Sequence, residues 1–460
     1  MSNNILVFFL TVFSGMGFLK GQTPPLETQL KVDTVVTGLN VPWEIQWGPQ
    51  GNIWMTERHG IISLVDPETG VRTILLDDTD NVYQQGESGM LGMVLHPDFA
   101  DTSHVFVVYT YLAGNIAKER LVRYYYNGTG LVDPYILIDD IPANSTHNGS
   151  RLIILPDYTL LMTTGDAQDQ NAAQNTSSLN GKILRLHLNG DIPADNPIAG
   201  SPVWSYGHRN AQGLVHAPNG KVYSSEHGPT TDDEINIIKK GANYGWPAVH
   251  GFCDNPSENN FCNENDVTTP IEAWSPTIAP SDVTWYAHDA IPEFQNSLLM
   301  AVLKEKMIVN IHFEEDGTVV DETYRYFENE WGRLRDILAG PEGELYLATN
   351  GESWSNTDPN THSIIKLTPE ETNTRVDNSK FRTVKIYPNP ADDKLFINVA
   401  DIPKAIYHVQ ISNITGKIMH DDKVTPDSRF SISINDYPPG VYTVFLISEK
   451  HFFTSNFLKN

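Results

Sequence analysis

One turn-and-strand unit recurs along this chain and limits the folds available to it. In each copy a Pro with Asn, Asp, Gln, Glu or Gly forms a turn, and a short apolar or aromatic strand follows, which is typical of a β-hairpin. Clear copies begin at Gly48, Leu155, Ala217 and Gly340, and looser ones at His96 and Pro292. Six copies spaced by several tens of residues favour a radially repeated all-β fold, and we predict a six-bladed β-propeller over residues 30–368.

The composition changes after the last copy. Residues 369–383 combine Glu, Asn, Thr, Asp and Ser with almost no apolar side chain, which predicts an exposed linker. Residues 384–460 then contain segments in which apolar and polar residues alternate, such as Lys394–Val399 and Gly440–Phe445. We therefore expect a second unit, a small C-terminal β-sandwich, that carries no catalytic set of His, Asp or Glu.

Charge and hydropathy restrict the partners and the location of the protein. The 460 residues include 57 acidic and 31 basic side chains, a formal net charge of −26, which excludes nucleic acid as a partner and suits hard cations such as calcium. An apolar run from Ile5 to Phe18 predicts a signal peptide over residues 1–21 and therefore export. No later segment approaches the roughly 18 apolar residues that a membrane span needs, so we expect no transmembrane segment.

The chain has two cysteines, Cys253 and Cys262. In an exported protein this short spacing favours a local disulfide that pins a loop. Two unpaired thiols are the alternative, whereas a metal site lacks further ligands nearby.

Candidate catalytic side chains lie in turns that precede strands. His147 is flanked by Thr, Asn and Gly, and imidazole is suited to accept a proton from a hydroxyl near neutral pH; a surface histidine is the alternative. Arg209 lies in a Gly-His-Arg-Asn turn, and its guanidinium can hold a planar oxyanion. Arg333 and Arg335 would face the same way on a strand, where an anion could join them; one solvated arginine and one structural salt bridge fit the spacing equally well.

Oxygen atoms suited to calcium gather between residues 228 and 244. Gly228 and Pro229 offer successive backbone carbonyls, and Asp232, Asp233 and Glu234 add carboxylates. Calcium takes six to eight oxygen ligands, including carbonyls. The spacing differs from that of a dedicated calcium loop such as an EF-hand, so the residues alone suggest a site without defining one.

Taken together, these motifs resemble the soluble pyrroloquinoline quinone (PQQ)-dependent aldose and glucose dehydrogenases. The resemblance covers about Val35 to Leu367. It rests on Leu39–Trp43, Gly86–Gly92, His96–Phe99, Gly165–Asp166, Gly181–Arg185, Gly207–Asn210, Gly241–Pro247, Pro276–Ser281 and Arg333–Asp336. So many motifs in the same order are far more specific than any one of them.

The resemblance implies a six-bladed propeller that holds the quinone beside a calcium ion on one face. It identifies His147 as the general base that removes the proton of the anomeric hydroxyl, with hydride transfer to the quinone and a lactone as product. It assigns Gly228 and Pro229 to the calcium beside the quinone, and Glu234 and Tyr244 to a second, structural calcium. The implied cofactor contacts are Arg209, Asn210, Thr277, Lys304, Arg333 and Arg335. An external electron acceptor would complete the cycle.

Two positions depart from the family pattern. Glu87 stands where the well-studied glucose enzyme has Gln near the substrate. The aromatic residue that caps the cofactor is shifted by one position around Trp274, so it is not assigned. Both departures leave the preferred aldose or polyol open.

The C-terminal unit resembles the sorting domain of the type IX secretion pathway. The resemblance rests on Tyr387–Pro390, Asn413–Lys417 and Pro439–Tyr442. It implies the type IX secretion machinery as a partner, and a protein that is secreted or attached to the cell surface after export through the outer membrane.

Two other functions suit a propeller, because fold alone does not fix function. One is a carbohydrate-binding module without turnover, and the other is a calcium-dependent hydrolase similar to a lactonase. The lysine and arginine clamps favour a bulky anionic cofactor, and hence the dehydrogenase, over both.

Overall fold

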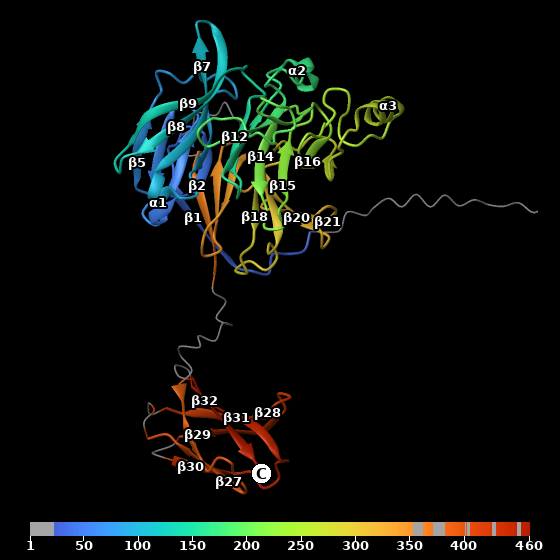
Figure 1. Ribbon diagram of the computed structural model, residues 1–460. Helices are drawn as coiled ribbons and strands as arrows, with labels where there is room; N and C mark the ends of the chain where they lie inside the picture. Colours follow the sequence, from blue (N-terminus) through green and yellow to red (C-terminus); the bar gives the residue numbers. More distant parts are fainter. Residues whose placement is uncertain are drawn as a thin grey trace, which may run out of the picture. The chain divides into compact units, whose positions relative to one another are not determined.

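The computed structural model describes residues 23–352, 362–370, 382–400, 402, 405–425, 429–448 and 452–460 (Figure 1). The chain divides into two compact units, Met1–Glu370 and Glu371–Asn460. The predicted signal peptide, and residues 371–381 of the predicted linker, lie outside the described residues.

Six four-stranded antiparallel sheets make up the described part of the first unit. In chain order they are β2 (Pro42–Trp47), β3 (Ile53–Glu57), β4 (Ile61–Val65) and β5 (Arg72–Asp77); β6 (Met90–Leu95), β7 (His104–Ala113), β8 (Ile116–Tyr126) and β9 (Leu131–Pro142); β10 (Gly149–Ile154), β11 (Thr159–Thr164), β12 (Lys182–His187) and β13 (Val203–Tyr206); β14 (Ala211–His216), β15 (Val222–Glu226), β16 (Asp233–Ile237) and β17 (Glu272–Trp274); β18 (Pro280–Tyr286), β19 (Ser297–Val302), β20 (Met307–Phe313) and β21 (Val320–Tyr326); and β22 (Leu334–Ala339), β23 (Leu345–Thr349) and β24 (Ile364–Pro369) with β1 (Leu30–Val36).

The sheets form a closed ring. The first strands of the blades, β2, β6, β10, β14, β18 and β22, pack each against the next, and β22 packs against β2. The last blade takes its outer strand from the start of the chain, because β1 pairs antiparallel with β24. This closure leaves no gap between the first and last blades, and it confirms the predicted six-bladed propeller.

The six turn units found in the sequence all join the first and second strands of a blade. Gly220 and Gly343 adopt positive φ angles of 80° and 86° in two of these turns, a conformation that costs glycine little. Apolar side chains then fill the space between neighbouring blades. For example, Trp54 of one blade and Met90 and Val107 of the next belong to one buried cluster.

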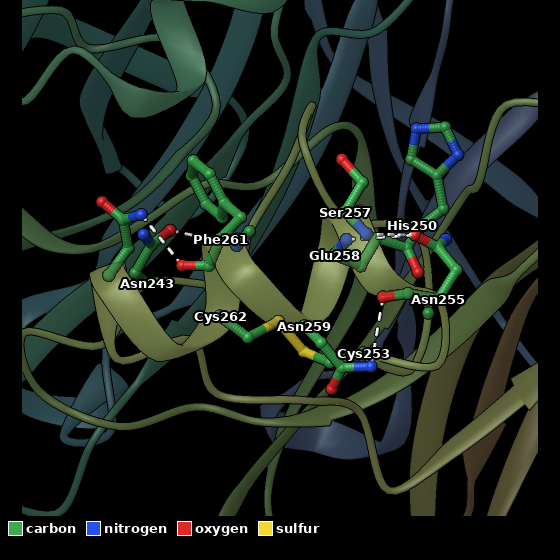
Figure 2. Close-up of a disulfide and its surroundings, with 12 residues drawn as sticks. Asn243, His250, Cys253, Asn255, Ser257, Glu258, Asn259, Phe261 and Cys262 are labelled. Atoms are coloured by element: carbon green, nitrogen blue, oxygen red, sulfur yellow. Dashed lines mark hydrogen bonds between the residues drawn. A yellow bond between two sulfur atoms is a disulfide. The ribbon is translucent and has the colours of Figure 1, made fainter.

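The helices are short: the 3-10 turn η1 (Pro49–Gly51), α1 (Phe99–Thr102), α2 (Gln170–Gln174) and α3 (Pro256–Asn265). The predicted Cys253–Cys262 disulfide is confirmed, and Figure 2 shows it beside α3. The segment that it pins is therefore largely helical, where the sequence predicted a loop. The Asn255 side chain caps this helix by accepting from the backbone N–H groups of Ser257 and Glu258. Its ten residues carry too few apolar side chains to show a helical period.

The second unit contains a five-stranded sheet, ordered β25-β32-β31-β28-β29, and a three-stranded sheet, ordered β26-β27-β30, among its described residues. The strands are β25 (Arg382–Thr383), β26 (Lys385–Tyr387), β27 (Lys394–Asn398), β28 (Tyr407–Asn413), β29 (Ile418–Val424), β30 (Arg429–Ser433), β31 (Gly440–Ile447) and β32 (Phe452–Lys459). Alternate residues such as Leu395 and Ile397, and Val409 and Ile411, enter one core. The predicted β-sandwich is thus confirmed.

No helix in the described ranges of either unit is long and apolar enough to cross a membrane.

Candidate active site

Residues predicted for the site lie at one end of the ring of first strands. Glu87 precedes β6, His147 precedes β10 and Arg209 precedes β14. Thr277 precedes β18, and Arg333 immediately precedes β22. Because each blade repeats the same strand order, the starts of its first strands meet around the axis on one face. The propeller therefore brings together five segments that are spread over about 250 residues of sequence.

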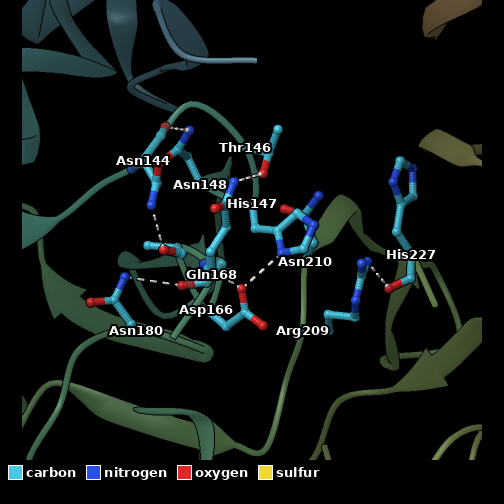
Figure 3. Close-up of polar contacts among 12 residues, drawn as sticks. Asn144, Thr146, His147, Asn148, Asp166, Gln168, Asn180, Arg209, Asn210 and His227 are labelled. Atoms are coloured by element: carbon cyan, nitrogen blue, oxygen red, sulfur yellow. Dashed lines mark hydrogen bonds and ion pairs between the residues drawn. The ribbon is translucent and has the colours of Figure 1, made fainter. Parts of the chain in front are cut away.

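His147 and Asp166 form a dyad on this face (Figure 3). The Nδ1 atom of His147 lies 2.8 Å from Oδ1 of Asp166, and the two side chains are 19% and 1% exposed. Asp166 also accepts from the backbone N–H of Gln168 at 2.8 Å and from Nε1 of Trp246 at 2.9 Å. A carboxylate that accepts three hydrogen bonds fixes the proton of the imidazole on Nδ1, and Nε2 is then free to accept one.

The surroundings keep Asp166 ionised. Burial raises the pKa of this carboxyl, but the hydrogen bond and charge of His147, with the donors on Gln168 and Trp246, outweigh burial and bring the pKa below its ordinary value. The carboxylate therefore orients the ring and can stabilise the imidazolium that forms when Nε2 takes up a proton. Asp166 belongs to the Gly165–Asp166 motif, but no separate role for it followed from that motif.

Arg209 is held next to the dyad. Its Nη1 donates to the carbonyl oxygen of His227 at 3.0 Å, and its guanidinium carbon lies 5.3 Å from the centre of the Trp246 ring. Burial lowers the pKa of Arg209, while the carboxylates of Asp166 and Glu226 favour its charged form. Trp246 therefore links Arg209 to Asp166, the partner of His147, a connection that sequence reasoning missed.

Four arginines with unpartnered Nε atoms surround the centre of this face. Among the described residues, the Nε atoms of Arg58, Arg209, Arg333 and Arg335 are buried and have no hydrogen-bond partner. Burial, followed by the like charge of Arg333, lowers the pKa of Arg335, and burial also lowers the pKa of Arg58. A protein that buries several cations close together needs an anion to satisfy them. The sequence did not predict Arg58 as a site residue, because a single arginine after a strand has no distinctive pattern.

Glu87 supplies one negative charge to this cluster. Its Oε2 accepts the backbone N–H of His147 at 3.0 Å. Its charge favours the ionised forms of Arg58, Arg209, Arg333 and Arg335. The acid thus lies beside both the dyad and the arginines, although its one charge does not balance those of Arg58, Arg333 and Arg335.

Thr277 and Lys304 meet on the same side of the ring. Nζ of Lys304 donates to the Thr277 carbonyl at 2.6 Å and to its hydroxyl at 3.2 Å. The Lys304 side chain is otherwise exposed, so its charge is available to an anion. A direct contact between Lys304 and the arginines is not seen in the described residues.

The four predicted calcium ligands line one small cavity. It is bounded by Gly207, Arg209, Glu226, His227, Gly228, Pro229, Asp232, Glu234, Tyr244, Trp246, Val249 and His250. The carbonyl oxygens of Gly228 and Pro229 accept no hydrogen bond from any described residue. A Cβ atom on Gly228 would lie 2.0 Å from the carbonyl oxygen of Thr231, so this tight turn requires glycine.

Glu234 and Tyr244 present different atoms to this cavity. Glu234 faces Glu226 across the β15–β16 register, and burial followed by the charge of Glu226 raises its pKa to about 8. The Tyr244 hydroxyl donates to the Ile237 carbonyl at 2.6 Å, which leaves only its backbone carbonyl for a cation. Within the described residues no group of three or more His, Cys, Asp or Glu side chains is arranged for a metal. A cation here would combine backbone carbonyls with the Glu234 carboxylate.

Comparison with known proteins places this geometry in a family. Quinoprotein glucose dehydrogenase B of Acinetobacter calcoaceticus is 32% identical over 436 residues, which cover 73% of this chain and 90% of that protein. Aldose sugar dehydrogenase YliI of Escherichia coli is 30% identical, over 70% of this chain and 91% of that protein. The PQQ-bound structure of aldose sugar dehydrogenase from Streptomyces coelicolor superposes with a TM-score of 0.65 at 34% identity, covering 75% of this chain and 99% of that one.

Two family descriptions match separate parts of the chain. Residues 385–460 match the secretion system C-terminal sorting domain, which confirms the resemblance of the tail. Residues 39–355 match Glucose / Sorbosone dehydrogenase, and this range holds every predicted site residue. The chain therefore belongs to the Glucose / Sorbosone dehydrogenase family.

Proposed function

We propose that the protein oxidises the anomeric hydroxyl of aldose sugars to lactones with bound PQQ and calcium. The observation that carries this proposal is the pairing of the His147–Asp166 dyad with a cluster of four arginines whose buried Nε atoms have no hydrogen-bond partner among the described residues. The dyad supplies a base, and the cluster requires an anion larger than the one carboxylate of Glu87. A binding module without turnover would need neither feature.

His147 acts as the general base. With Nδ1–H donated to Asp166, Nε2 accepts the proton of the anomeric hydroxyl, and the carboxylate stabilises the resulting imidazolium. The turn that holds His147 is fixed by its own backbone N–H, which donates to Glu87. Glu87 is then positioned to accept a hydrogen bond from another sugar hydroxyl, a role in substrate binding that fits its place beside the base.

The remaining cations fit a cofactor with several carboxylates. Arg333, Arg335 and Lys304 would hold those carboxylates, Thr277 and Asn210 would add polar contacts, and Arg209 would balance charge on the quinone oxygen. When bound, the quinone supplies the hydride acceptor and calcium supplies a Lewis acid. The buried Nδ2 of Asn210, which has no partner, is a further donor suited to this anion.

Calcium suits the donors at the edge of the same site. The carbonyls of Gly228 and Pro229 would hold the ion next to the cofactor, since no described residue donates to them. Glu234 and the Tyr244 carbonyl would hold a second ion, and a cation would relieve the proximity of Glu234 to Glu226. The hydrolase alternative lacks support, because that class holds its metal mainly with side-chain oxygens.

We further propose that the sorting domain directs the protein to the type IX secretion machinery. Export through the outer membrane would place the enzyme in the medium or on the cell surface, where it meets sugars. An external electron acceptor would reoxidise the reduced cofactor there. The predicted signal peptide would begin this route.

Reconstitution tests the proposed activity. The purified chain is titrated with PQQ in the presence of calcium, followed by absorbance, and dye reduction is then measured with a panel of aldoses and polyols. We expect a saturable spectral change and turnover with at least one aldose. The His147→Ala variant should bind the quinone but lose turnover, whereas His187→Ala, an exposed histidine at the end of β12, should resemble the wild type. Absence of turnover with every sugar would exclude the activity.

A further inference from the structure

Gln212 connects two residues that the proposed function assigns to the cofactor. It lies on β14, 6% exposed, at a point where the pairing of β14 with β15 shifts register between Ala211 and Gly213. Its Nε2 donates to Oδ1 of Asn210 at 3.2 Å, and its Oε1 accepts from Nη1 of Arg335 at 3.0 Å. A β-bulge redirects a side chain, and here it allows one amide to span two blades.

The amide determines which atoms of its neighbours remain free. Oδ1 of Asn210 accepts from both Gln212 and the backbone N–H of Gly149, at 3.1 Å, so the Asn210 amide turns its donor, Nδ2, away from them. Arg335 gives one Nη1 hydrogen to Gln212 and keeps Nε without a partner. Both free atoms are buried donors. Because of Gln212, Asn210 and Arg335 therefore offer hydrogen-bond donors, and not acceptors, to a bound ligand.

A buried network of charged side chains holds the backbone of Gln212 in place. Nε of Arg151 donates to the Gln212 carbonyl at 2.9 Å. The Arg151 guanidinium contacts Glu44 at 2.6 Å, Asp336 at 3.2 Å and Asp282 at 3.3 Å. These side chains come from four different first strands, so the backbone of Gln212 is tied to the centre of the propeller.

We propose that Gln212 is a positioning residue that orients the Asn210 amide and the Arg335 guanidinium as donors toward the bound quinone. The inference rests on the proposed function, because it concerns the same cofactor. It adds a residue to which neither the family motifs nor the sequence assigned a role.

Replacing the amide by a carboxylate should reverse this selection. In Gln212→Glu the new carboxylate forms an ion pair with Arg335 and so competes with the cofactor. The carboxylate also has no hydrogen to donate to Asn210. The carboxylate repels Oδ1 of Asn210 and thereby favours rotation of that amide, against its hydrogen bond from Gly149, to donate Nδ2 to Glu and present Oδ1 to the anionic ligand. Both changes weaken quinone binding while the size and shape of the side chain are retained.

Spectral titration of the full chain with PQQ, in calcium-containing buffer, measures this effect without turnover. We expect the Kd to rise about ten- to a hundredfold in Gln212→Glu, and about three- to tenfold in Gln212→Met, which removes both hydrogen bonds but adds no charge. Gln295→Glu places the same charge on the exposed surface and should leave the Kd unchanged. Thermal unfolding of each variant checks that the propeller is intact.

The order of the variants separates positioning from a merely structural role. A structural role predicts that Glu, the closer match in shape, binds quinone at least as well as Met, and that result would overturn the inference. A Kd within twofold of the wild type in both variants would overturn it too. If Gln212→Glu does not fold, the Gln212→Met titration decides alone: weaker binding supports the inference and unchanged binding refutes it. Failure of the wild type to bind PQQ would instead contradict the proposed function.

Discussion

Replacing Asp166 by Asn tests the dyad, because the change keeps the size of the side chain and removes its charge. Asp166 accepts three hydrogen bonds, two of them at Oδ1 from His147 and Gln168 and one at Oδ2 from Trp246. If the Asn side-chain oxygen accepts the hydrogen bonds from His147 and Gln168, its NH₂ group faces the Trp246 N–H. Two donors then oppose each other, and the hydrogen bond to Trp246 is lost. In the other orientation the amide donates to Nδ1 and moves the imidazole proton to Nε2.

Both orientations impair the base, and the size of the loss follows from the bonds involved. The charge-assisted hydrogen bond to the imidazolium is worth about 1.5–3 kcal/mol, which corresponds to roughly a 10- to 150-fold loss of kcat. If the proton moves to Nε2, that atom cannot act as a base, and the loss approaches about 10⁴, as in hydrolases whose orienting Asp is changed to Asn. We therefore expect kcat to fall between about ten- and ten-thousandfold in Asp166→Asn.

The assay is dye reduction at saturating aldose by the PQQ- and calcium-loaded variant. Spectral titration beforehand shows how much quinone each preparation holds, so that a loss of cofactor is not counted as a loss of catalysis. Asp80→Asn, at an exposed position in the β5–β6 connection, is the matched control. A kcat for Asp166→Asn within twofold of the wild type, with the quinone bound, would refute the role of the dyad.

Three further outcomes are expected. Glu87→Gln should raise the KM for aldoses roughly five- to tenfold with a smaller change in kcat, because a neutral acceptor replaces a charged one; an unchanged KM across the sugar panel would remove Glu87 from the substrate site. The double variant Cys253→Ser and Cys262→Ser removes a disulfide with a sequence separation of 9 residues. It should lower the free energy of unfolding of the propeller, measured by urea denaturation, by about 2.6 kcal/mol. A reductant should destabilise the wild type but not this variant. The pKa of Asp166 in the folded state lies below its ordinary value of 3.8, so the stability that its ionised form contributes is present above pH 3.8 and is lost as the pH falls through the folded-state pKa. Between pH 5 and pH 2 the urea midpoint should therefore fall less steeply in Asp166→Asn than in the wild type. Parallel curves would contradict this.

Much of the fold could be predicted from local sequence. The turn units at Gly48 and Ala217 mark hairpins because Pro, Asn and Gly restrict the backbone in the same way wherever the strands finally pack. The alternation in Lys394–Val399 likewise predicted a strand of the second unit. Helix α3 was not predicted because it lacks an apolar period. The Asn255 cap and the disulfide stabilise it instead.

Less of the candidate site than of the fold could be predicted from the sequence. The family motifs drew attention to His147, Arg209 and the paired arginines, but they did not show which atoms of these residues remain free. That depends on partners brought close only by folding, such as Asp166, from the next loop of the same blade, for His147, and Gln212, from another blade, for Arg335. No pattern within one segment encodes a hydrogen bond between two segments more than a hundred residues apart.

The strand-forming repeats, the paired cysteines, the sorting tail and the family motifs can thus all be recognised without a structure, because each depends on neighbours along the chain. The tertiary structure decided three other features. β1 closes the ring against β24, five turns gather on one face, and the buried Nε atoms of four arginines are left without partners in the described part of the chain. These features depend on long-range packing, since the burial and the partners of a charge are fixed only when distant strands meet.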